Sequence, residues 1–332
     1  MSLLLEPYTL RQLTLPNRIA VSPMCQYSAV DGLANDWHLV HLGSRAVGGA
    51  GLVITEAVAV TADGRITAED LGLWDDAQIA PLQRITRFIT AQGAVAGIQL
   101  AHAGRKASTY RPWLGKPGSV KLEEGGWQPV GPSKIAFDPQ HTAPRELSQD
   151  EIEDVIGAFV ASTERALKAG FKVVEIHAAH GYLLHQFLSP LSNQRRDEYG
   201  SSFENRIRFL LETTKAVRAA IPATTPLFVR ISAMDWAYNG WNLIDSIELC
   251  TQLKALGVDL IDVSSGGAIH NAKIDAKPNF QVPFATAIRT DALSLLSPNK
   301  SKTTPRNHWC AGERCTFACQ NTLIAIAGSS IG

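Results

Sequence analysis

The chain has 332 residues, and its 31 basic side chains match its 31 acidic side chains, so its formal net charge is zero. A neutral chain offers no electrostatic case for binding nucleic acid or an anionic membrane. No uncharged apolar run reaches the length of a membrane span, and the apolar start lacks the basic residues of a signal peptide. The composition indicates a cytoplasmic protein with room for a large core, as one α/β barrel or two ordinary domains.

Cysteine spacing gives little sign of disulfides or of a metal site. The cysteines are Cys25, Cys250, Cys310, Cys315 and Cys319. The first two lie far apart in a chain of cytosolic character, so we expect no disulfide framework. The last three have a spacing that is not standard for zinc, and no fourth ligand is evident. We therefore expect no metal site.

Amphipathic helices and short β-branched strands alternate along the chain. Residues 10–15 predict a hairpin, and residues 36–47 predict a helix that Asn35 or Asp36 caps. Strands are predicted at about 18–21, 52–56, 94–100, 171–176, 227–231 and 259–263, and further helices at 75–91, 150–169, 205–220 and 244–256. Such alternation predicts a parallel sheet with helices on its face.

The fold class that fits this alternation best is a (β/α)8 TIM barrel. The Gly-x-Gly-x-x-Gly fingerprint of a dinucleotide-binding fold does not follow the first strand, which favours the barrel over a doubly wound sheet. The alternation stops at Thr290, so the last two β/α units are missing or replaced by an atypical tail. We therefore expect an incomplete barrel domain over residues 1–289 and a poorly ordered tail over residues 290–332.

One segment, residues 105–144, interrupts the alternation. It is rich in proline, glycine, lysine and tryptophan, and it is too long for a plain connection. Long insertions of this kind are usually lids or binding loops. A passive excursion over the surface is the alternative.

The clearest candidate for a site follows the strand at residues 171–176. His177, His180 and Tyr182 stand directly after this apolar run. Active sites of parallel α/β folds are built at the carboxyl ends of the strands. The three side chains could also be ordinary polar residues of a loop. A metal site on the two histidines is a further alternative, but the segment itself supplies no carboxylate or third histidine.

Several separated segments resemble the Old Yellow Enzyme family of flavin-dependent ene-reductases. They are residues 16–27 (PNRIAVSPMCQY), 99–105 (QLAHAGR), 175–184 (EIHAAHGYLL), 188–200 (LSPLSNQRRDEYG) and 203–206 (FENR). The cysteine after Ser-Pro-Met is similar to that of the bacterial "thermophilic-like" branch. The resemblance covers about residues 1–289 in register. It implies a (β/α)8 barrel that binds FMN at its C-terminal mouth, in agreement with the alternation of helices and strands.

The resemblance also implies a reaction. NADPH or NADH reduces FMN, and hydride then passes to the β-carbon of an alkene that is conjugated to a carbonyl group. Charge develops on the carbonyl oxygen as hydride arrives, and His177 and His180 are the donors that bind this oxygen. Tyr182 is the acid that protonates the α-carbon from the opposite face. Tyr27 belongs to the substrate pocket.

Seven residues are assigned to the flavin by the same resemblance. Ser22, Pro23 and Met24 line the ring with their backbone, Cys25 lies near it, Ala57 and Gln99 flank its polar edge, and Arg230 lies beside its N1–C2 carbonyl. Cys25 would tune the reduction potential, and Arg230 would stabilise the anionic reduced ring. Without the resemblance, a lone cysteine is more often a small buried hydrophobe, and an arginine can be part of a surface ion pair.

The altered C-terminus leaves two hypotheses open. Barrels commonly bind phosphate after the seventh and eighth strands, and the sequence offers no counterpart there beyond Arg289. The chain is then either an FMN-dependent ene-reductase or a truncated barrel with weak or no FMN binding and no turnover. As an enzyme it would act on a small activated alkene, without nucleic acid or membrane partners, and a homo-oligomer is compatible with the resemblance.

Overall fold

Six parallel strands lie side by side in the order of the sequence. They are β3 (Ile19–Val21), β4 (Leu52–Ala59), β5 (Val95–Ala101), β8 (Val173–Ala178), β9 (Leu227–Ser232) and β10 (Leu260–Ser264). The computed structural model describes residues 2–294 and 323–325, and β11 (Leu323–Ala325) pairs antiparallel with β3. The order β10-β9-β8-β5-β4-β3-β11 confirms the six predicted strands and adds one that the sequence pattern does not predict.

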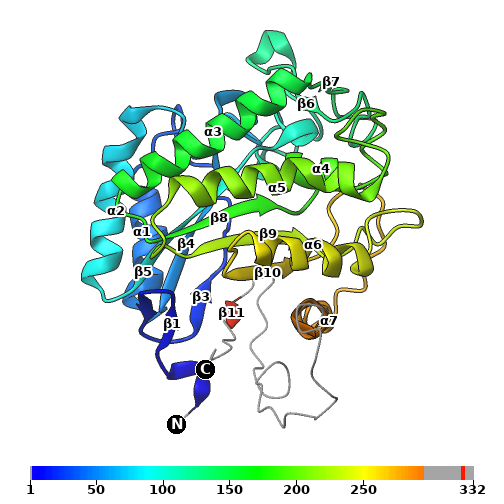
Figure 1. Cartoon of the computed structure of the whole chain (residues 1–332). Coiled ribbons are helices and arrows are strands. Elements are labelled where there is room, and N and C mark those ends of the chain that lie inside the picture. The colour runs from blue at the N-terminus through cyan, green and yellow to red at the C-terminus, as the bar shows by residue number, and fades with distance from the viewer. Residues whose placement is uncertain (1, 295–322, 326–332) are drawn as a thin grey trace.

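Helices follow the strands and cover the outer face of the sheet. They are α1 (Asp36–Val47), α2 (Ile79–Ala91), α3 (Gln149–Lys168), α5 (Phe203–Ala220), α6 (Leu243–Ala255) and α7 (Val282–Ser294), and Figure 1 shows them around the strands. The short α4 (Leu183–Leu188) precedes α5 and is not evident from the sequence pattern. All five predicted helices are present. The α2 helix begins later than predicted because Asp75 caps a separate 3-10 turn before it.

Side-chain caps fix where two of these helices begin. Asn35 accepts a hydrogen bond from the backbone N–H of Trp37 and caps α1, so Asn35 rather than Asp36 is the cap. Ser148 and Glu151 form a reciprocal capping box at the start of α3. These side chains satisfy amide groups that the first turn of a helix leaves unpaired. The helices therefore start at defined positions relative to the strands.

Apolar side chains pack on both faces of the sheet. The larger cluster lies between the sheet and the helices and includes Val174 of β8 and Phe159 of α3. A smaller cluster lies on the inner face and includes Val173 and Phe228. Burying both faces is typical of parallel sheets, whose strands therefore read as nearly continuous apolar runs.

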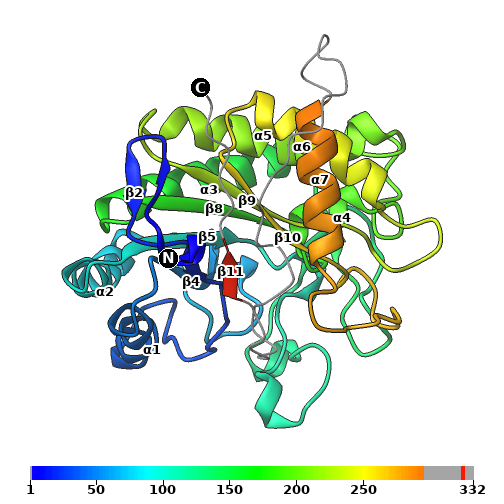
Figure 2. The ribbon, with the colours of Figure 1, turned by 90° about the horizontal axis from the view of Figure 1, so that it is seen from below.

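A hairpin closes the N-terminal end of the barrel. Its strands, β1 (Tyr8–Leu10) and β2 (Leu13–Leu15), pair antiparallel and confirm the hairpin predicted at residues 10–15. Leu10 and Leu15 join the inner apolar cluster. Figure 2, seen from below, places the hairpin in front of the sheet.

The inner face of the sheet changes from apolar to polar toward the carboxyl ends of the strands. Alternate residues of a strand share a face. The inner series are Val173, Glu175 and His177 on β8; Phe228, Arg230 and Ser232 on β9; and Leu260, Asp262 and Ser264 on β10. The first residue of each series belongs to the inner apolar cluster or packs against it. The polar residues of the mouth thus stand on rigid strands above an apolar floor.

The insertion folds over the mouth side of the barrel. It begins in the 3-10 turn Gly104–Lys106, which follows β5, and its strand β6 (Val130–Gly131) pairs with β7 (Arg145–Glu146) just before α3. Two further 3-10 turns, Pro112–Leu114 and Leu122–Glu124, lie within it. The segment is therefore structured rather than a plain linker.

These elements confirm a TIM-barrel-like α/β fold, with six β/α units in the part of the chain that the structure describes. The predicted domain boundary after residue 289 falls within α7 and stays a prediction. Most of the predicted tail, residues 295–322 and 326–332, lies outside the described residues, and so do Cys310, Cys315 and Cys319.

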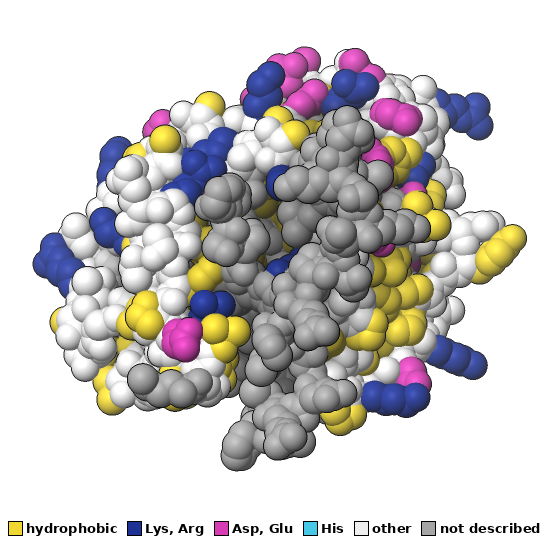
Figure 3. Space-filling model, turned by 60° about the horizontal axis from the view of Figure 1, so that its bottom comes forward, with side chains coloured by type: hydrophobic (Ala, Val, Ile, Leu, Met, Phe, Trp, Pro, Cys, Tyr) yellow, Lys and Arg dark blue, Asp and Glu magenta, His cyan; other side chains and the backbone are white. Residues whose placement is uncertain are grey.

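Basic and acidic side chains both occur on the one face of the molecule that Figure 3 shows. Within residues 2–294 and 323–325, no helix is long and apolar enough to cross a membrane.

Candidate active site at the mouth of the barrel

The turn after β8 brings three predicted site residues together. His177 is buried on the inner face of β8, with 3% of its surface exposed. The ring centroids of His177 and His180 are 5.2 Å apart, and those of His177 and Tyr182 are 5.1 Å apart. Both pairs meet edge to face. The three side chains therefore form one cluster, and their catalytic roles stay a prediction.

His180 connects two strands across the mouth. Its backbone is left-handed, with a φ of 59°, which few residues other than glycine adopt. Its Nε2 lies 2.6 Å from Oγ of Ser264 at the end of β10. The imidazole is thereby held between the turn after β8 and the end of β10.

Burial keeps both histidines neutral. Desolvation is the main reason that the pKa values of His177 and His180 lie well below the usual value, and the charge of Arg230 lowers them further. A neutral imidazole has one N–H donor and one acceptor nitrogen. Each ring can therefore donate a hydrogen bond to a substrate oxygen at neutral pH.

Tyr182 lies in an apolar cluster with two residues of the loop after β3. Cys25 and Tyr27 pack with Tyr182 against Ile66 and Ala107. Burial raises the pKa of Tyr182 well above its usual value, and the neighbouring Cys25 and Tyr27 raise it further. Burial also raises the pKa of the Cys25 thiol and of the Tyr27 phenol. Tyr182 thus holds its proton firmly in the ground state.

The loop after β3 also carries the remaining predicted flavin contacts of that segment. Ser22 is buried, and its Oγ has no hydrogen-bond partner among the described residues. Pro23 and Met24 are partly exposed, and the carbonyl oxygen of Met24 accepts a hydrogen bond of 2.8 Å from Gln26 Nε2. The loop therefore presents backbone and a free hydroxyl beside Cys25.

A layer of buried polar side chains crosses the barrel below His177. Gln99 Nε2 donates a hydrogen bond of 2.7 Å to Glu175 Oε1, and Arg230 Nε lies 3.2 Å from Asp262 Oδ2. Burial, followed by the charge of Asp262, raises the pKa of Glu175 to about 8, although Arg230 acts in the opposite direction. Arg230 is thus part of a buried ion pair and not of a surface one.

Sequence reasoning identified Gln99 and Arg230 in this layer but missed Glu175 and Asp262. A signal was present, because each of the two is a charged residue inside an otherwise apolar strand. Lysine, glutamate, arginine and aspartate are almost never fully buried unless they are paired. A carboxylate in such a run therefore indicates a partner on a neighbouring strand.

Unpaired polar atoms at the mouth fit a polar, planar ligand such as the flavin ring. Among the described residues, His177 Nδ1, Glu175 Oε2 and Ser22 Oγ are buried and have no hydrogen-bond partner. Such atoms are rare in folded proteins without a ligand or water beside them. Ala57 pairs in register with Gln99, so these two predicted contacts of the ring lie side by side on β4 and β5.

Small residues leave space next to Tyr182. A narrow cavity at the ends of β4 and β5 is lined by Ala57, Ala59, Gly64, Ile66, Asp70, Ala101, Ala103 and Tyr182. Alanines and glycine at strand ends allow a flat ring to approach the backbone. One predicted flavin residue, Ala57, and one predicted catalytic residue, Tyr182, therefore border this cavity.

The insertion contributes side chains to this site. The Trp113 ring meets the Tyr27 ring edge to face, with centroids 5.7 Å apart. Lys106 Nζ lies 4.6 Å from the ring centroid of Phe137 and 4.9 Å from that of Tyr182. These contacts support the binding-loop interpretation over a passive excursion. Lys106 was missed, although it directly follows the 99–105 segment that carries the resemblance.

Arg289 is not placed to bind a phosphate group at the mouth. It lies on α7 and interacts electrostatically with Tyr8, which belongs to the hairpin at the N-terminal end of the barrel. That end is opposite the candidate site. The sequence offers no other candidate for the phosphate, so the predicted phosphate site has no assigned residue.

Thiols and possible metal ligands do not gather at this site in the described part of the chain. Cys25 and Cys250 are free thiols. In residues 2–294 and 323–325, no three histidine, cysteine, aspartate or glutamate side chains converge as a metal site would require.

Comparisons with known proteins place the chain in a family. Residues 3–327 match the NADH:flavin oxidoreductase / NADH oxidase family. The chain is 50% identical to an NADH:flavin oxidoreductase of Gibberella zeae over 299 residues, which cover 85% of this chain and 72% of that protein. It is 47% identical to an NADPH dehydrogenase of Geobacillus thermodenitrificans over 293 residues, which cover 88% of this chain and 81% of that protein.

Solved structures resemble the fold at lower sequence identity. Morphinone reductase has a TM-score of 0.73 and 26% identity, with 87% of this chain and 77% of that chain covered. An Old Yellow Enzyme homologue from Zymomonas mobilis has a TM-score of 0.70 and 28% identity, with 87% and 79% covered. A 2-naphthoyl-CoA reductase has a TM-score of 0.78 and 26% identity, but this chain spans only 44% of its length. The chain belongs to the NADH:flavin oxidoreductase / NADH oxidase family, which is the Old Yellow Enzyme family, and is an oxidoreductase that uses FMN and NAD(P)H.

Proposed function

We propose that this oxidoreductase reduces activated C=C bonds of α,β-unsaturated carbonyl compounds. The observation that carries the proposal is the cluster of His177, His180 and Tyr182, which joins two neutral donors to one protonated phenol. Carbonyl polarisation and proton delivery are the two tasks that this reduction requires of the protein.

Bound FMN would supply hydride to the β-carbon, and NAD(P)H would replenish it. The residues proposed to hold the ring are Ser22, Pro23, Met24, Cys25, Ala57, Gln99 and Arg230. Arg230 would place its positive charge beside the N1–C2 edge of the ring. Its pairing with Asp262 over 3.2 Å holds the guanidinium in one orientation for that task.

His177 and His180 would bind the carbonyl oxygen of the substrate. His177 has an unpaired ring nitrogen, Nδ1, among the described residues, while Nε2 of His180 is near Ser264 Oγ. Because both rings are neutral, each can donate one hydrogen bond to an oxygen on which negative charge develops. Donors fixed in advance lower the barrier because they need no reorganisation during the reaction.

Tyr182 would donate its proton to the α-carbon. The raised pKa keeps the phenol protonated at neutral pH, so the acid is present in the form that the step consumes. The resulting phenolate then takes up a proton from water. Tyr27 would contact the substrate beside Cys25, with Trp113 behind it.

Rapid-mixing measurements of the two half-reactions test these roles. Tyr182→Phe should slow alkene reduction by about 100-fold or more, because general acid catalysis typically contributes that much, and should leave reduction of the flavin by NAD(P)H within about twofold. His177→Ala should slow alkene reduction and weaken the binding of phenol-type ligands. Equal slowing of both half-reactions in Tyr182→Phe would rule out the proton-donor role, and unchanged enone turnover in His177→Ala would rule out oxygen binding.

The hypothesis of a truncated barrel without turnover finds no support among the relatives named above. Free thiols at Cys25 and Cys250 are in keeping with a reducing compartment, so we place the reaction in the cytoplasm. The purified protein should be yellow and contain FMN at a one-to-one ratio. A colourless protein that takes up no FMN would overturn the proposal.

A further inference from the structure

One strained turn carries two of the proposed catalytic side chains. His180 has a φ of 59° and Gly181 has a φ of 73°. A Cβ on Gly181 would lie 2.0 Å from the carbonyl oxygen of Gly267, so only glycine fits there. A strained conformation persists only where its surroundings over-determine it. The supports of this turn therefore determine where His180 and Tyr182 point.

Side chains from two other segments bind the backbone of His180. Ser232 Oγ, at the end of β9, accepts a hydrogen bond of 2.9 Å from the N–H of His180. Lys106 Nζ donates a hydrogen bond of 2.9 Å to the carbonyl oxygen of the same residue. Ser232 in turn donates to the carbonyl oxygen of Gly266, which ties the turn to the loop after β10.

Two residues of α4 bind the backbone of Gly181 in the same way. His185 Nδ1 accepts a hydrogen bond of 2.8 Å from the N–H of Gly181, and Gln186 Nε2 donates one of 2.7 Å to its carbonyl oxygen. Every backbone polar group of His180 and Gly181 thus has a side-chain partner. Backbone groups in regular elements usually pair with other backbone groups, so this turn has a dedicated support.

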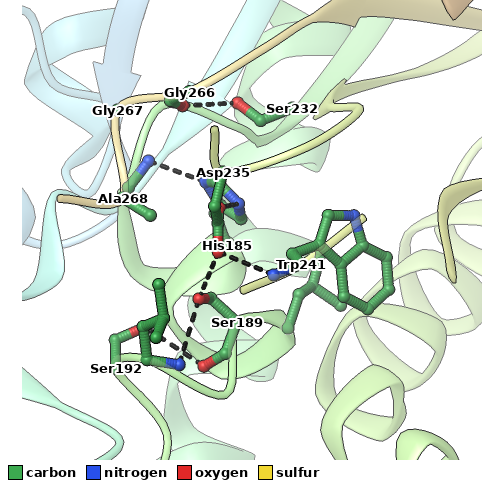
Figure 4. Close-up of polar contacts among 12 residues, drawn as sticks. His185, Ser189, Ser192, Ser232, Asp235, Trp241, Gly266, Gly267 and Ala268 are labelled. Carbon is green, nitrogen blue, oxygen red and sulfur yellow. Dashed lines mark hydrogen bonds and ion pairs between the residues drawn. The ribbon is translucent and has the colours of Figure 1, made fainter. Parts of the chain in front are cut away.

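His185 is itself held in one orientation by a buried carboxylate. Its Nε2 lies 3.0 Å from Asp235 Oδ1, and both side chains are fully buried. Because Nδ1 accepts the hydrogen bond from Gly181, the ring proton is on Nε2, the nitrogen that faces Asp235. Oδ2 of Asp235 accepts hydrogen bonds from Ser189 Oγ and from the N–H of Trp241 (Figure 4).

This arrangement is not a hydrolytic triad. In such a triad the histidine stands between the serine and the carboxylate. Here Asp235 stands between Ser189 and His185, and all three side chains are fully buried. These three side chains therefore cannot contact a substrate. Their contacts stabilise the turn instead.

We propose that His185 is a positioning residue, which Asp235 orients and whose Nδ1 fixes the amide of Gly181, and thereby the directions of His180 and Tyr182. The inference rests on the proposed roles of His180 and Tyr182 and adds a residue that touches no reacting atom. A displacement of a catalytic group by about 1 Å can cost a rate on the order of 100-fold. A single hydrogen bond to the turn can therefore matter for the reaction.

Two substitutions separate the two ends of the His185 ring. In His185→Asn the amide oxygen can take the place of Nδ1 and keep the acceptor for Gly181. In His185→Gln the amide nitrogen can take the place of Nε2 and keep the donor for Asp235, but the acceptor for Gly181 is lost. Both variants lose one of the two interactions, so a general loss of packing affects them alike.

Hydrogen–deuterium exchange of the peptide that contains Gly181, measured on the holoenzyme, is the direct readout. We expect the amide of Gly181 to exchange at least tenfold faster in His185→Gln and near the native rate in His185→Asn. Alkene reduction should fall by about tenfold or more in His185→Gln and by about threefold or less in His185→Asn. Flavin reduction by NAD(P)H serves as the internal reference for both variants.

Ser192→Ala is the matched control within the same buried region (Figure 4). It removes a buried hydrogen bond of 2.8 Å to the carbonyl oxygen of Gln186 and leaves the amide of Gly181 paired. Its melting temperature should fall while exchange at Gly181 and the alkene rate stay native.

Exchange at Gly181 that is equal in His185→Asn and His185→Gln would overturn the inference. If neither variant folded, Ser232→Ala would supply the same test through the amide of His180, and unchanged exchange there would count against the inference. A wild-type enzyme that reduced no alkene would refute the proposed function alone, because the exchange measurement does not depend on turnover.

Discussion

The carboxyl group of Glu175 has an unusual place for a charged residue, since it lies inside the barrel one layer below His177. It accepts a hydrogen bond from Gln99 and lies near the ion pair of Arg230 and Asp262. Because its pKa is raised to about 8, Glu175 is mostly protonated at neutral pH. The layer then holds a carboxyl group that keeps its proton beside the ion pair of Arg230 and Asp262.

Replacing Glu175 by glutamine should change how stability depends on pH. The usual pKa of the group is 4.5, and the folded value is about 8, so the folded state binds more protons between these values. Stability from this group is therefore present below about pH 4.5 and is lost as the pH rises through 8. Glutamine does not titrate, so Glu175→Gln should lose less stability toward pH 9.

Urea unfolding at pH 5, 7 and 9 measures this difference. Relative to Glu175→Gln, the wild type should lose on the order of 4 kcal/mol of unfolding free energy between pH 5 and pH 9. Glu153→Gln, on the exposed face of α3, is the control and should follow the wild type at every pH. Parallel pH profiles for Glu175→Gln and the wild type would show that Glu175 is ionised in the folded state throughout.

At the level of residues, the sequence predicts those contacts that are close along the chain. His177, His180 and Tyr182 lie within one short segment, so their common location follows from the strand that precedes them. The contacts of Glu175 with Gln99 and of His180 with Ser264 join different strands. Periodicity indicates which face of a strand is buried, but it does not indicate which residue of a neighbouring strand lies opposite.

Two loops, after β8 and after β10, approach each other so closely that glycine is required at the contact. Gly267 has a φ of 89°, and a Cβ on it would lie 2.6 Å from the backbone of His180. Gly267→Ala should therefore displace the His180 turn. The added Cβ would clash with backbone atoms, which cannot move aside as the end of a flexible side chain can. We expect lower stability and slower alkene reduction, measured by thermal unfolding and by the alkene half-reaction.

Gly49→Ala is the matched control for this contact. Gly49 has nearly the same φ, 90°, but nothing lies within 4 Å of the position that a Cβ would occupy. It should show only the backbone cost of about 1–2 kcal/mol for a left-handed residue, with native kinetics. Equal stability and equal alkene reduction in Gly267→Ala and Gly49→Ala would mean that the two loops are not in close contact at Gly267.

At the level of elements, prediction succeeds where a pattern is long. The six parallel strands and five helices follow from runs of β-branched residues and from helical periodicity, and all of them are present. The short α4 and the three-residue β11 offer too few residues for any period to be recognised. The composition identifies the insertion as a separate segment. It does not predict that Trp113 contacts Tyr27 or that Phe137 contacts Lys106, because these contacts depend on tertiary packing.

For the whole molecule, the candidate flavin site joins strands that are distant in the sheet. Its residues come from the loop after β3, from β4 and β5, and from β9, which β8 separates from the others. A ring that contacts all of them would connect both halves of the six parallel strands. The folded protein, but not the unfolded chain, presents these residues together, so binding must stabilise the fold.

Titration of the protein with FMN, after the native cofactor has been removed, should raise the melting temperature. At a free concentration of about 100 times Kd, the stabilisation should reach about 2.7 kcal/mol.

Riboflavin lacks the phosphate, so its effect on the melting temperature measures the contribution of the ring alone. Because the proposed ring-binding residues include Gln99 and Arg230, while Arg289 lies at the opposite end, we expect riboflavin to give at least half of the FMN shift. A shift with FMN and none with riboflavin would show that a phosphate site dominates binding. No shift with either would favour the truncated barrel without cofactor, and it would contradict the assignment of the ring-binding residues.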